Sequence, residues 1–280
     1  MADNLMGTAS EVSVLVPQVW SSNYYSALLA DLPFNDSISK DYQGEIQNLG
    51  DRVLISQIPE FDQAHELGEL ERSNASAVTV TQQSLIINKR FVKDFILTNK
   101  AVLQSLPVMN QLRDLAIYSI MKAIQAEIIS LIVPNAASPD HSIAFDSSTT
   151  LAVADMLEAK ELLDAQDVPQ SGRVMVLGSA QLNDLFAITT IQSSDFVASN
   201  APVLSGQLPS QIFGFAPKFT SEVGNVVYMF HPSFMTMAAQ QGMNVKQYDR
   251  GGEGIRAERV NCDTLMGIKQ LDGLRVVTIG

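Results

Sequence analysis

The strongest constraint on this chain is a long amphipathic segment near its middle. From about Leu106 to Val133, apolar residues recur at spacings of three and four, the periodicity of one helix face. Pro107 is acceptable in the first turn of a helix, and Pro134 ends it. At 1.5 Å per residue this helix spans about 40 Å, so it has to organise a whole domain. Its apolar positions are Met109, Leu112, Ala116, Ile120, Ile124, Ile128 and Leu131.

Two segments before this helix have the two-residue period of β-strands. Over 50–58, Val53 and Ile55 alternate with the residues between them, and the run over 77–87 repeats this period. The polar segment 59–76 between the two runs is too long for a tight turn. The pattern therefore predicts two strands that flank a long polar tip.

After the helix, the pattern alternates between helix and strand. It predicts a second helix over 151–165 and a buried strand over 173–178. A short helix follows this strand, with Ser179 as its N-cap. A strand over 226–230 completes a small mixed sheet, and 243–279 is mostly β-like. The chain is therefore expected to belong to the α+β class.

The first forty residues have little core-forming periodicity. They carry a short apolar stretch over 12–16 and then the aromatic residues Trp20, Tyr24 and Tyr25. This pattern indicates an arm that places apolar anchors on another surface. A short helix docked on its own domain is the alternative.

Charge is segregated between the polar tip and the segment after it. The tip carries several acids with no basic residue before Arg72, whereas the next segment is rich in lysine. Opposed clusters of this kind can meet between subunits, and a solvated, mobile tip is the alternative. We therefore predict that Glu66, Glu69 and Glu71 face the cluster of Lys89, Arg90 and Lys93, or another basic patch, on a neighbour.

Composition excludes several classes of protein. Charged residues make up 17% of the chain, against about 25% in an average domain, so much of the surface is uncharged and suits a subunit covered by neighbours. The net charge of −12 argues against a nucleic-acid-binding protein, which needs a basic stripe. No run of apolar residues is long enough to span a membrane, and the N-terminal sequence lacks the pattern of a signal peptide.

Two sequence motifs resemble catalytic or cofactor-binding patterns without completing them. His65 and Glu66 begin a string like the HExxH zinc helix, but Glu69 stands where the second histidine is required. We interpret this string as an acidic loop. Gly252, Gly254 and Ala257 fit the G-x-G-x-x-A dinucleotide motif, but a strand pattern follows them. We interpret them as a turn between strands and predict no cofactor.

Two further groups of reactive side chains also favour a structural interpretation. Asp155, Glu158 and Glu161 lie three residues apart on one helix and are expected to form its solvated face. Cys262 is the chain's one cysteine, so it cannot form an internal disulfide, which fits a reducing cytoplasm during synthesis. We expect it to be an inert apolar residue. A structural protein is therefore the leading class, and no enzyme activity is predicted.

The order of these elements resembles the major capsid proteins of tailed bacteriophages, which have the Hong Kong 97-type capsid fold. The resemblance covers nearly the whole chain and rests on several weak strings in one order. The first strings are PQVWSSNYYSALLADLPF, GDRVLISQIP, LIINKRFVKDF and AEIISLIVPN. The later strings are LEAKELLDAQDVPQSGRVMVLGSAQLNDL, GQLPSQIFGFAPKFTSEV and DTLMGIKQLDGLRVVTI.

The resemblance implies a division of the chain into five parts. Residues 1–40 would form an N-terminal arm, and 41–89 an extended hairpin loop, the E-loop. Residues 90–139 would form the peripheral domain with its long spine helix. Residues 140–230 would form the axial domain, and 231–280 would return to the peripheral domain.

The resemblance also implies a function and partners. The subunit would assemble with itself into pentamers and hexamers of an icosahedral shell that encloses double-stranded DNA without sequence-specific binding. A separate scaffolding protein, a portal protein and a decoration protein are the implied partners, and a membrane is not. The chain would be made in the host cytoplasm and reside in the virion. The alternatives are an encapsulin-like compartment shell and, more remotely, a nucleotide-dependent cytoplasmic enzyme.

Overall fold

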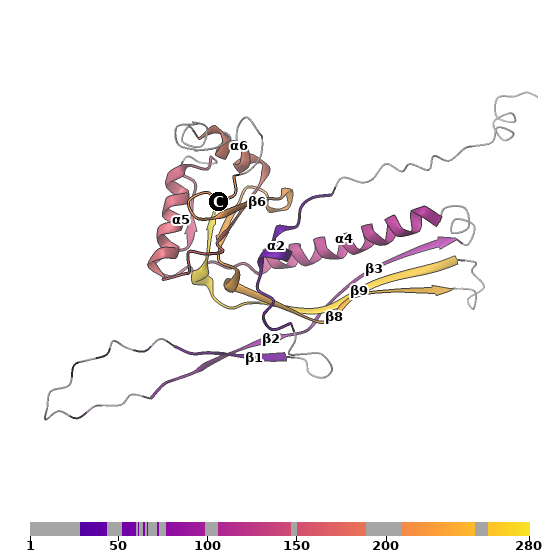
Figure 1. Ribbon diagram of the computed structural model, residues 1–280, viewed down its shortest axis with the longest axis horizontal. Coiled ribbons are helices and arrows are strands. Elements are labelled where there is room, and N and C mark those ends of the chain that lie inside the picture. Colours follow the sequence, from indigo (N-terminus) through magenta and orange to yellow (C-terminus); the bar gives the residue numbers. More distant parts are fainter. Residues whose placement is uncertain are drawn as a thin grey trace, which may run out of the picture. The chain divides into compact units, whose positions relative to one another are not determined.

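The protein was examined as a computed structural model, which describes residues 29–43, 52–59, 61, 64, 66, 72, 77–98, 106–146, 150–188, 209–249 and 257–280. The chain divides into two units, residues 1–30 and 31–280. Every helix and strand below belongs to the second unit (Figure 1).

A long helix lies along a three-stranded antiparallel sheet. The helix, α4 (Leu106–Leu131), confirms the predicted helix and ends two residues earlier than expected. The sheet has the order β3 (Lys89–Thr98), β9 (Ala257–Gln270), β8 (Met235–Asp249) (Figure 1). The apolar stripe of α4 is buried in the same core as residues of β9 and the partly buried phenylalanines of β3. Hydrophobic burial on one helix face therefore holds the helix against the sheet. The buried stripe is Ala116, Ile120, Ile124 and Ile128.

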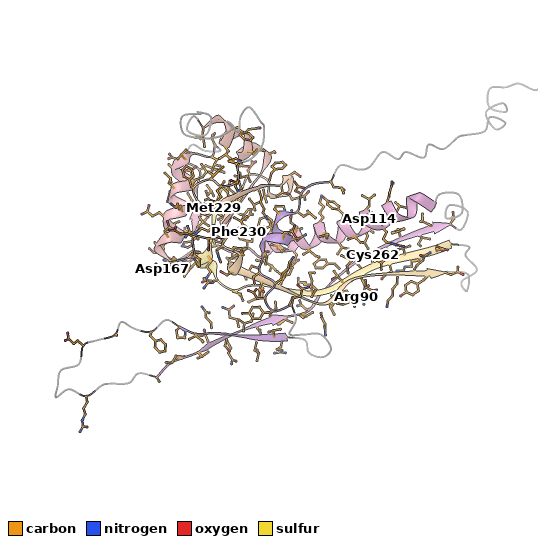
Figure 2. All side chains as sticks on the ribbon, viewed as in Figure 1. Arg90, Asp114, Asp167, Met229, Phe230 and Cys262 are labelled. Atoms are coloured by element: carbon orange, nitrogen blue, oxygen red, sulfur yellow. The ribbon has the colours of Figure 1, made fainter. Side chains whose placement is uncertain are left out.

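A five-stranded mixed sheet forms a second core. Its helices are α5 (Val153–Ala165) and α6 (Ser179–Ala187), and both contribute buried residues to this core. The central strand β7 (Val227–Phe230) connects the two cores, because Met229 belongs to one and Phe230 to the other. Both residues are labelled in Figure 2. The order of the strands is β4 (Ser142–Ile143), β10 (Val276–Ile279), β7 (Val227–Phe230), β5 (Val174–Leu177) and β6 (Ala216–Phe219).

The short helix α2 (Pro33–Ser37) closes the first core. Its Phe34 is fully buried, stacks on Phe230 at 5.6 Å and meets Tyr228 edge-on. Three 3-10 turns complete the described elements. They are η1 (Ser221–Val223), η2 (Pro232–Phe234) and η4 (Gly273–Arg275).

A separate two-stranded ribbon is packed on the long sheet. Its strands are β1 (Arg52–Gln57) and β2 (Thr81–Ile86), which pair antiparallel. One face of the ribbon carries Val53 and Leu85, which pack with Ala238 of β8. The ribbon confirms the predicted pair of strands, although the second strand begins four residues later than expected.

Two predictions about helix ends are wrong. Ser179 is the first residue of α6, and Gly178, in an extended conformation, is the N-cap without a side-chain hydrogen bond. Glycine is required there because a Cβ atom would collide with the backbone of Gly224. Asp155 is not on a solvated face: it is 2% exposed, and its carboxylate accepts hydrogen bonds from the backbone N–H groups of Ala152 and Asp146. The acid thus caps the first turn of α5, while Glu158 and Glu161 are exposed as predicted.

Candidate functional site

Strand β3 separates the basic residues that are adjacent in the sequence. Lys89 lies on the face that carries the core residues Phe91 and Phe95, and its Nζ is 2.9 Å from Oε1 of Glu127 on α4. Arg90 points to the opposite face, where its Nη2 donates to Oδ2 of Asp263 at 2.7 Å (Figure 2). The two cations therefore already have partners within the chain.

Lys93 is different from these two residues. It is exposed on β3, and within the described ranges its side chain has no hydrogen bond or ion pair. Of the three predicted cations, Lys93 is therefore the one best placed to bind a neighbour. Glu66, from the predicted acidic set, is also exposed.

A polar cluster occupies the face of the sheet that points away from α4. Asp94 accepts hydrogen bonds from Asn261, which lies opposite it on β9, and from Arg259, which lies opposite Ile96. The Arg259 guanidinium, through its hydrogen bond, lowers the pKa of the Asp94 carboxyl below its usual value. The aliphatic side chains of Val92 and Ile96 are exposed on the same face. This face therefore combines fixed charges with uncovered apolar surface.

The outer face of the ribbon carries exposed apolar side chains between polar residues such as Ser56 and Gln82. Leu54 is 60% exposed, and Ile58 and Phe61, which follow β1, are 72% and 73% exposed. A two-stranded ribbon is at best marginally stable alone in water, and here its inner face is held by the core. An outer face of this composition indicates a surface that another molecule covers. Val78, Val80 and Ile86 continue it on the second strand and its approach.

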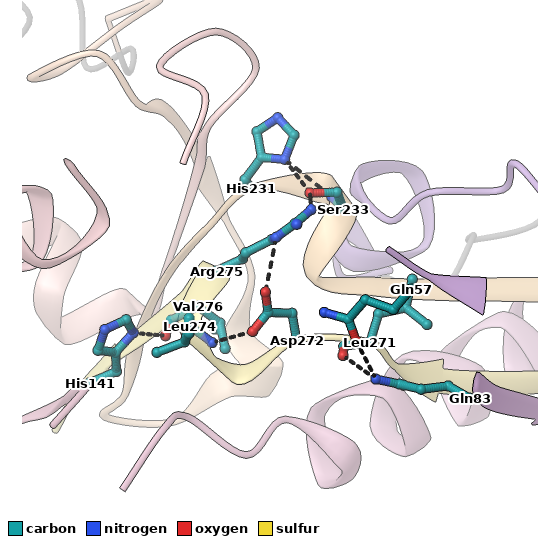
Figure 3. Close-up of polar contacts among 10 residues, drawn as sticks. All are labelled: Gln57, Gln83, His141, His231, Ser233, Leu271, Asp272, Leu274, Arg275 and Val276. Atoms are coloured by element: carbon teal, nitrogen blue, oxygen red, sulfur yellow. Dashed lines mark hydrogen bonds and ion pairs between the residues drawn. The ribbon is translucent and has the colours of Figure 1, made fainter. Parts of the chain in front are cut away.

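A polar junction joins the two sheets where the chain passes between them (Figure 3). The hydroxyl of Ser233 in η2 donates to Nδ1 of His231 at 2.7 Å and accepts from Nη1 of Arg275 at 2.8 Å. Nε of Arg275 in turn donates to Oδ2 of Asp272 at 3.1 Å. The network ties η2 to η4, the turns by which the chain passes between the two sheets.

The ribbon is attached to the same junction. The side-chain amide of Gln83 on β2 donates to the carbonyl oxygen of Leu271 at 3.0 Å, next to Asp272 (Figure 3). Gln83 also lies 3.4 Å from the side chain of Gln57 across the ribbon. The junction therefore holds three parts of the fold in fixed positions: the small sheet, the long sheet and the ribbon.

His231 makes this junction sensitive to pH. Burial, together with the charges of Arg275 and Arg173, lowers the pKa of His231 below 6.5. The unfolded chain then binds more protons than the folded chain as the pH falls below about 6.5, so stability falls on acidification. We expect His231→Gln to lose less stability than the wild type between about pH 7.5 and about pH 5.5. Urea denaturation at both pH values measures this difference, and parallel losses in the two proteins would contradict it.

Several predicted residues lie outside the described residues. These are the arm aromatics Trp20, Tyr24 and Tyr25, the tip acids Glu69 and Glu71, and His65, Gly252 and Gly254.

The described residues show little reactive chemistry. Cys262 is buried without a disulfide, and burial raises the pKa of its thiol, so the thiolate is disfavoured. Within the described ranges, no three histidine, cysteine or acidic side chains come together as metal ligands. No helix among the described residues has the length and hydropathy to cross a membrane.

The sequence did not reveal the acidic residues that form ion pairs with Lys89 and Arg90. Asp263 and Glu127 are far from β3 in the sequence, and their partnership depends on the register of β3 with β9 and on the position of α4. The pairing of Asp94 on β3 with Arg259 on β9 cannot be recognised in the sequence, because it depends on how the two strands are aligned. His231 also had no local motif to mark it.

Solved structures with the same fold come from phage particles. A structure from Mycobacterium phage Che8 has 19% identity and a TM-score of 0.75, with 95% of this chain and 97% of that chain covered. The capsid of cyanophage P-SCSP1u has 12% identity and a TM-score of 0.76, with 97% and 94% covered. The capsid asymmetric unit of cyanophage Pam1 has 16% identity and a TM-score of 0.71, with 100% and 98% covered.

The fold is therefore that of these phage structures, which confirms the predicted Hong Kong 97-type fold. Residues 108–279, more than half of the chain, match the phage capsid protein family, and the chain belongs to this family. A search of curated proteins found no match. The function as a major capsid protein of a tailed phage is thus confirmed, and the compartment-shell and enzyme alternatives are not favoured.

Proposed function

We propose that the subunit assembles into pentamers and hexamers of an icosahedral shell around a double-stranded DNA genome. The observation that supports this proposal is the group of exposed apolar side chains on and beside the ribbon, which a second molecule would bury. The net charge of −12 suits a container, because carboxylates do not bind packaged DNA tightly. Electron microscopy of the purified chain tests this proposal, and discrete small oligomers under every condition would contradict it.

We further propose the division into an arm (1–40), an E-loop (41–89), a peripheral domain (90–139 and 231–280) and an axial domain (140–230). Two observations support it: the ribbon packs on the long sheet, and the second core is formed mainly by residues between 143 and 229. Val277 and Ile279 of the returning segment also lie in this second core. The arm residues Trp20, Tyr24 and Tyr25 would then contact neighbouring subunits. A separate scaffolding protein, a portal protein and a decoration protein are proposed partners, and synthesis is proposed in the host cytoplasm.

The tip acids are proposed to bind a basic surface of a neighbour. Reversing Glu66, Glu69 and Glu71 to lysine is expected to impair assembly while leaving the subunit folded, because Glu66 is exposed and the other acids belong to the same tip. Each exposed pair contributes about 0–1 kcal/mol, and a shell repeats the contact many times. Particle yield by sedimentation and the circular dichroism spectrum of the subunit measure the two effects.

A charge swap identifies the partner of the tip. If the tip acids bind Lys93 of a neighbour, adding Lys93→Glu to the triple lysine variant of the tip should restore the particles that the triple variant alone does not form. The control is Lys93→Glu alone, which should impair assembly like the reversed tip. Normal particles from the reversed tip would exclude the pairing.

A further inference from the structure

An apolar groove lies between the helices α2 and α4 and the strand β8. Its cavity measures about 410 Å³, a volume within the range of sites for small molecules, about 300–1,000 Å³. Ile117, Met121 and Ile124 of α4 form one wall, and Met237 and Met243 of β8 form another. Met121 and Met243 are each 38% exposed, so the groove opens to the surface.

Irregular pairing of β8 shapes the mouth of this groove. The register of β8 with β9 shifts between Ala239 and Gln241 and again between Gln241 and Asn244. A bulge leaves residues outside the ladder and bends the strand. Gly242 and Met243 lie at the second shift and line the groove, so the irregular segment of β8 forms its lip.

Two buried polar side chains line the groove, Asn35 of α2 and Thr264 of β9. Nδ2 of Asn35 donates to the backbone carbonyl oxygen of Met121 at 3.0 Å, and the Thr264 hydroxyl donates to the carbonyl oxygen of Gln241 at 2.9 Å. Oδ1 of Asn35 accepts no hydrogen bond from any described residue, although Asn35 is only 6% exposed. A buried acceptor without a donor is unfavourable and therefore uncommon in folded proteins. These two side chains use their donors within the fold and leave oxygen atoms as acceptors, so a molecule that enters the groove has to bring a donor.

The other lining residues favour a neutral aromatic ring. Four of them are methionines, whose flexible thioethers adapt to different shapes and make favourable contacts with the edge of an aromatic ring. Lys40 and Asp36 also line the groove, and both are exposed. Because their charges are opposite, they select neither a cation nor an anion. The four methionines are Met121, Met237, Met243 and Met266.

We propose that this groove binds a small neutral aromatic molecule with one hydrogen-bond donor, a chemistry represented by indole. The ring lies between the methionines of α4 and β8, and its N–H group donates to Oδ1 of Asn35. The molecule supplies the donor that the fold lacks at this position and covers the exposed parts of Met121 and Met243. The site goes beyond the proposed assembly, because it lies within one subunit and needs no second copy of the chain.

Indole and N-methylindole test this site, because N-methylindole keeps both rings and lacks the N–H group. Binding to the full chain, purified as the unassembled subunit, is followed by the methyl NMR signals of its methionines. We expect indole to shift the signals of Met121 and Met243 with a Kd of about 1 mM or lower, and N-methylindole to bind about fivefold more weakly. Met175 and Met229 are buried in the second core and serve as internal controls whose signals should not shift.

Asn35→Leu separates the hydrogen bond from the general packing of the groove. Indole and N-methylindole should bind this variant with equal affinity, because the acceptor has been removed. The comparison of the two ligands stays valid if the substitution also changes the shape of the groove. Ala239→Leu adds bulk to a lining residue and should weaken both ligands. Leu157→Ser, which changes an exposed side chain on α5, is the matched control and should bind both ligands like the wild type.

Three results would overturn the proposal. The first is the absence of any shift of the Met121 and Met243 signals at indole concentrations well above the expected Kd. The second is equal affinity of the wild type for indole and N-methylindole. The third is a preference for indole that Asn35→Leu retains in full.

Discussion

Arg173→Met is expected to destabilise the fold by about 3 kcal/mol. The Arg173 side chain is 1% exposed. Its Nη2 donates to the carbonyl oxygen of Val168 at 2.6 Å and lies 2.6 Å from Asp164, and its Nε donates to the carbonyl oxygen of Pro169 at 3.0 Å. Methionine keeps the length of the side chain but leaves these acceptors without their donor. The guanidinium also lies 5.7 Å from the centre of the Phe215 ring. This cation–π contact is lost in the variant, because methionine carries no charge.

Urea denaturation followed by circular dichroism measures this loss. Lys122→Met is the control, because it removes an exposed lysine that pairs with Glu222 at 2.9 Å on the surface, and we expect little change from it. Equal unfolding midpoints for Arg173→Met and the wild type would show that the buried guanidinium does not stabilise the end of α5. A loss equal to that of Lys122→Met would lead to the same conclusion.

Gly267→Ala is expected to destabilise the attachment of the ribbon to the long sheet by about 1–3 kcal/mol. A Cβ atom at this position on β9 would lie 2.4 Å from the carbonyl oxygen of Ile86 and 3.2 Å from the Cα atom of Ile87. Both neighbours are backbone atoms, so the chain at the end of β2 would have to move. Leu85 and Ile87 would then lose packing against Ala238. Amide hydrogen exchange of β2 measures this local opening.

Gly242→Ala is the matched control for this prediction. Gly242 lies on β8 in the same sheet, and a Cβ atom there would meet no described atom within 4 Å. We expect unchanged exchange rates in β2 for this variant. Faster exchange of β2 in both variants would indicate a general effect of replacing glycine in the sheet. Slow exchange of β2 in Gly267→Ala would show that the close approach of β2 to β9 tolerates a methyl group.

The sequence predicted the elements whose signals are local and long. The helix over 106–131 has seven turns of apolar periodicity, and no tertiary contact is needed to recognise it. Strand β3 was not predicted, because apolar residues on both of its faces, such as Phe91 and Val92, obscure the alternation. The cap formed by Asp155 was missed because acids at a spacing of three occur both on solvated faces and in first turns of helices.

The candidate contact surfaces were less predictable for a physical reason. A run of cations shows its charge in the sequence, but which of them remain free depends on partners far along the chain. Arg90 and Asp263 are 173 positions apart, and the register of β3 and β9 brings them together. The groove beside α4 likewise depends on two register shifts in β8, and bulges of this kind have no sequence signal in β8 apart from Gly242.

The position of β10 in the small sheet has a consequence for biosynthesis. Residues 276–279 pair with β7 on one side and with β4 on the other, so they join β4 to the rest of the sheet. A nascent chain still attached to the ribosome cannot close this sheet until those residues have been translated. Fragments that stop before Val276 would lack the strand and leave Val227 and Met229 without their partners. Closure of the small sheet therefore depends on residues that are translated after all of its other strands.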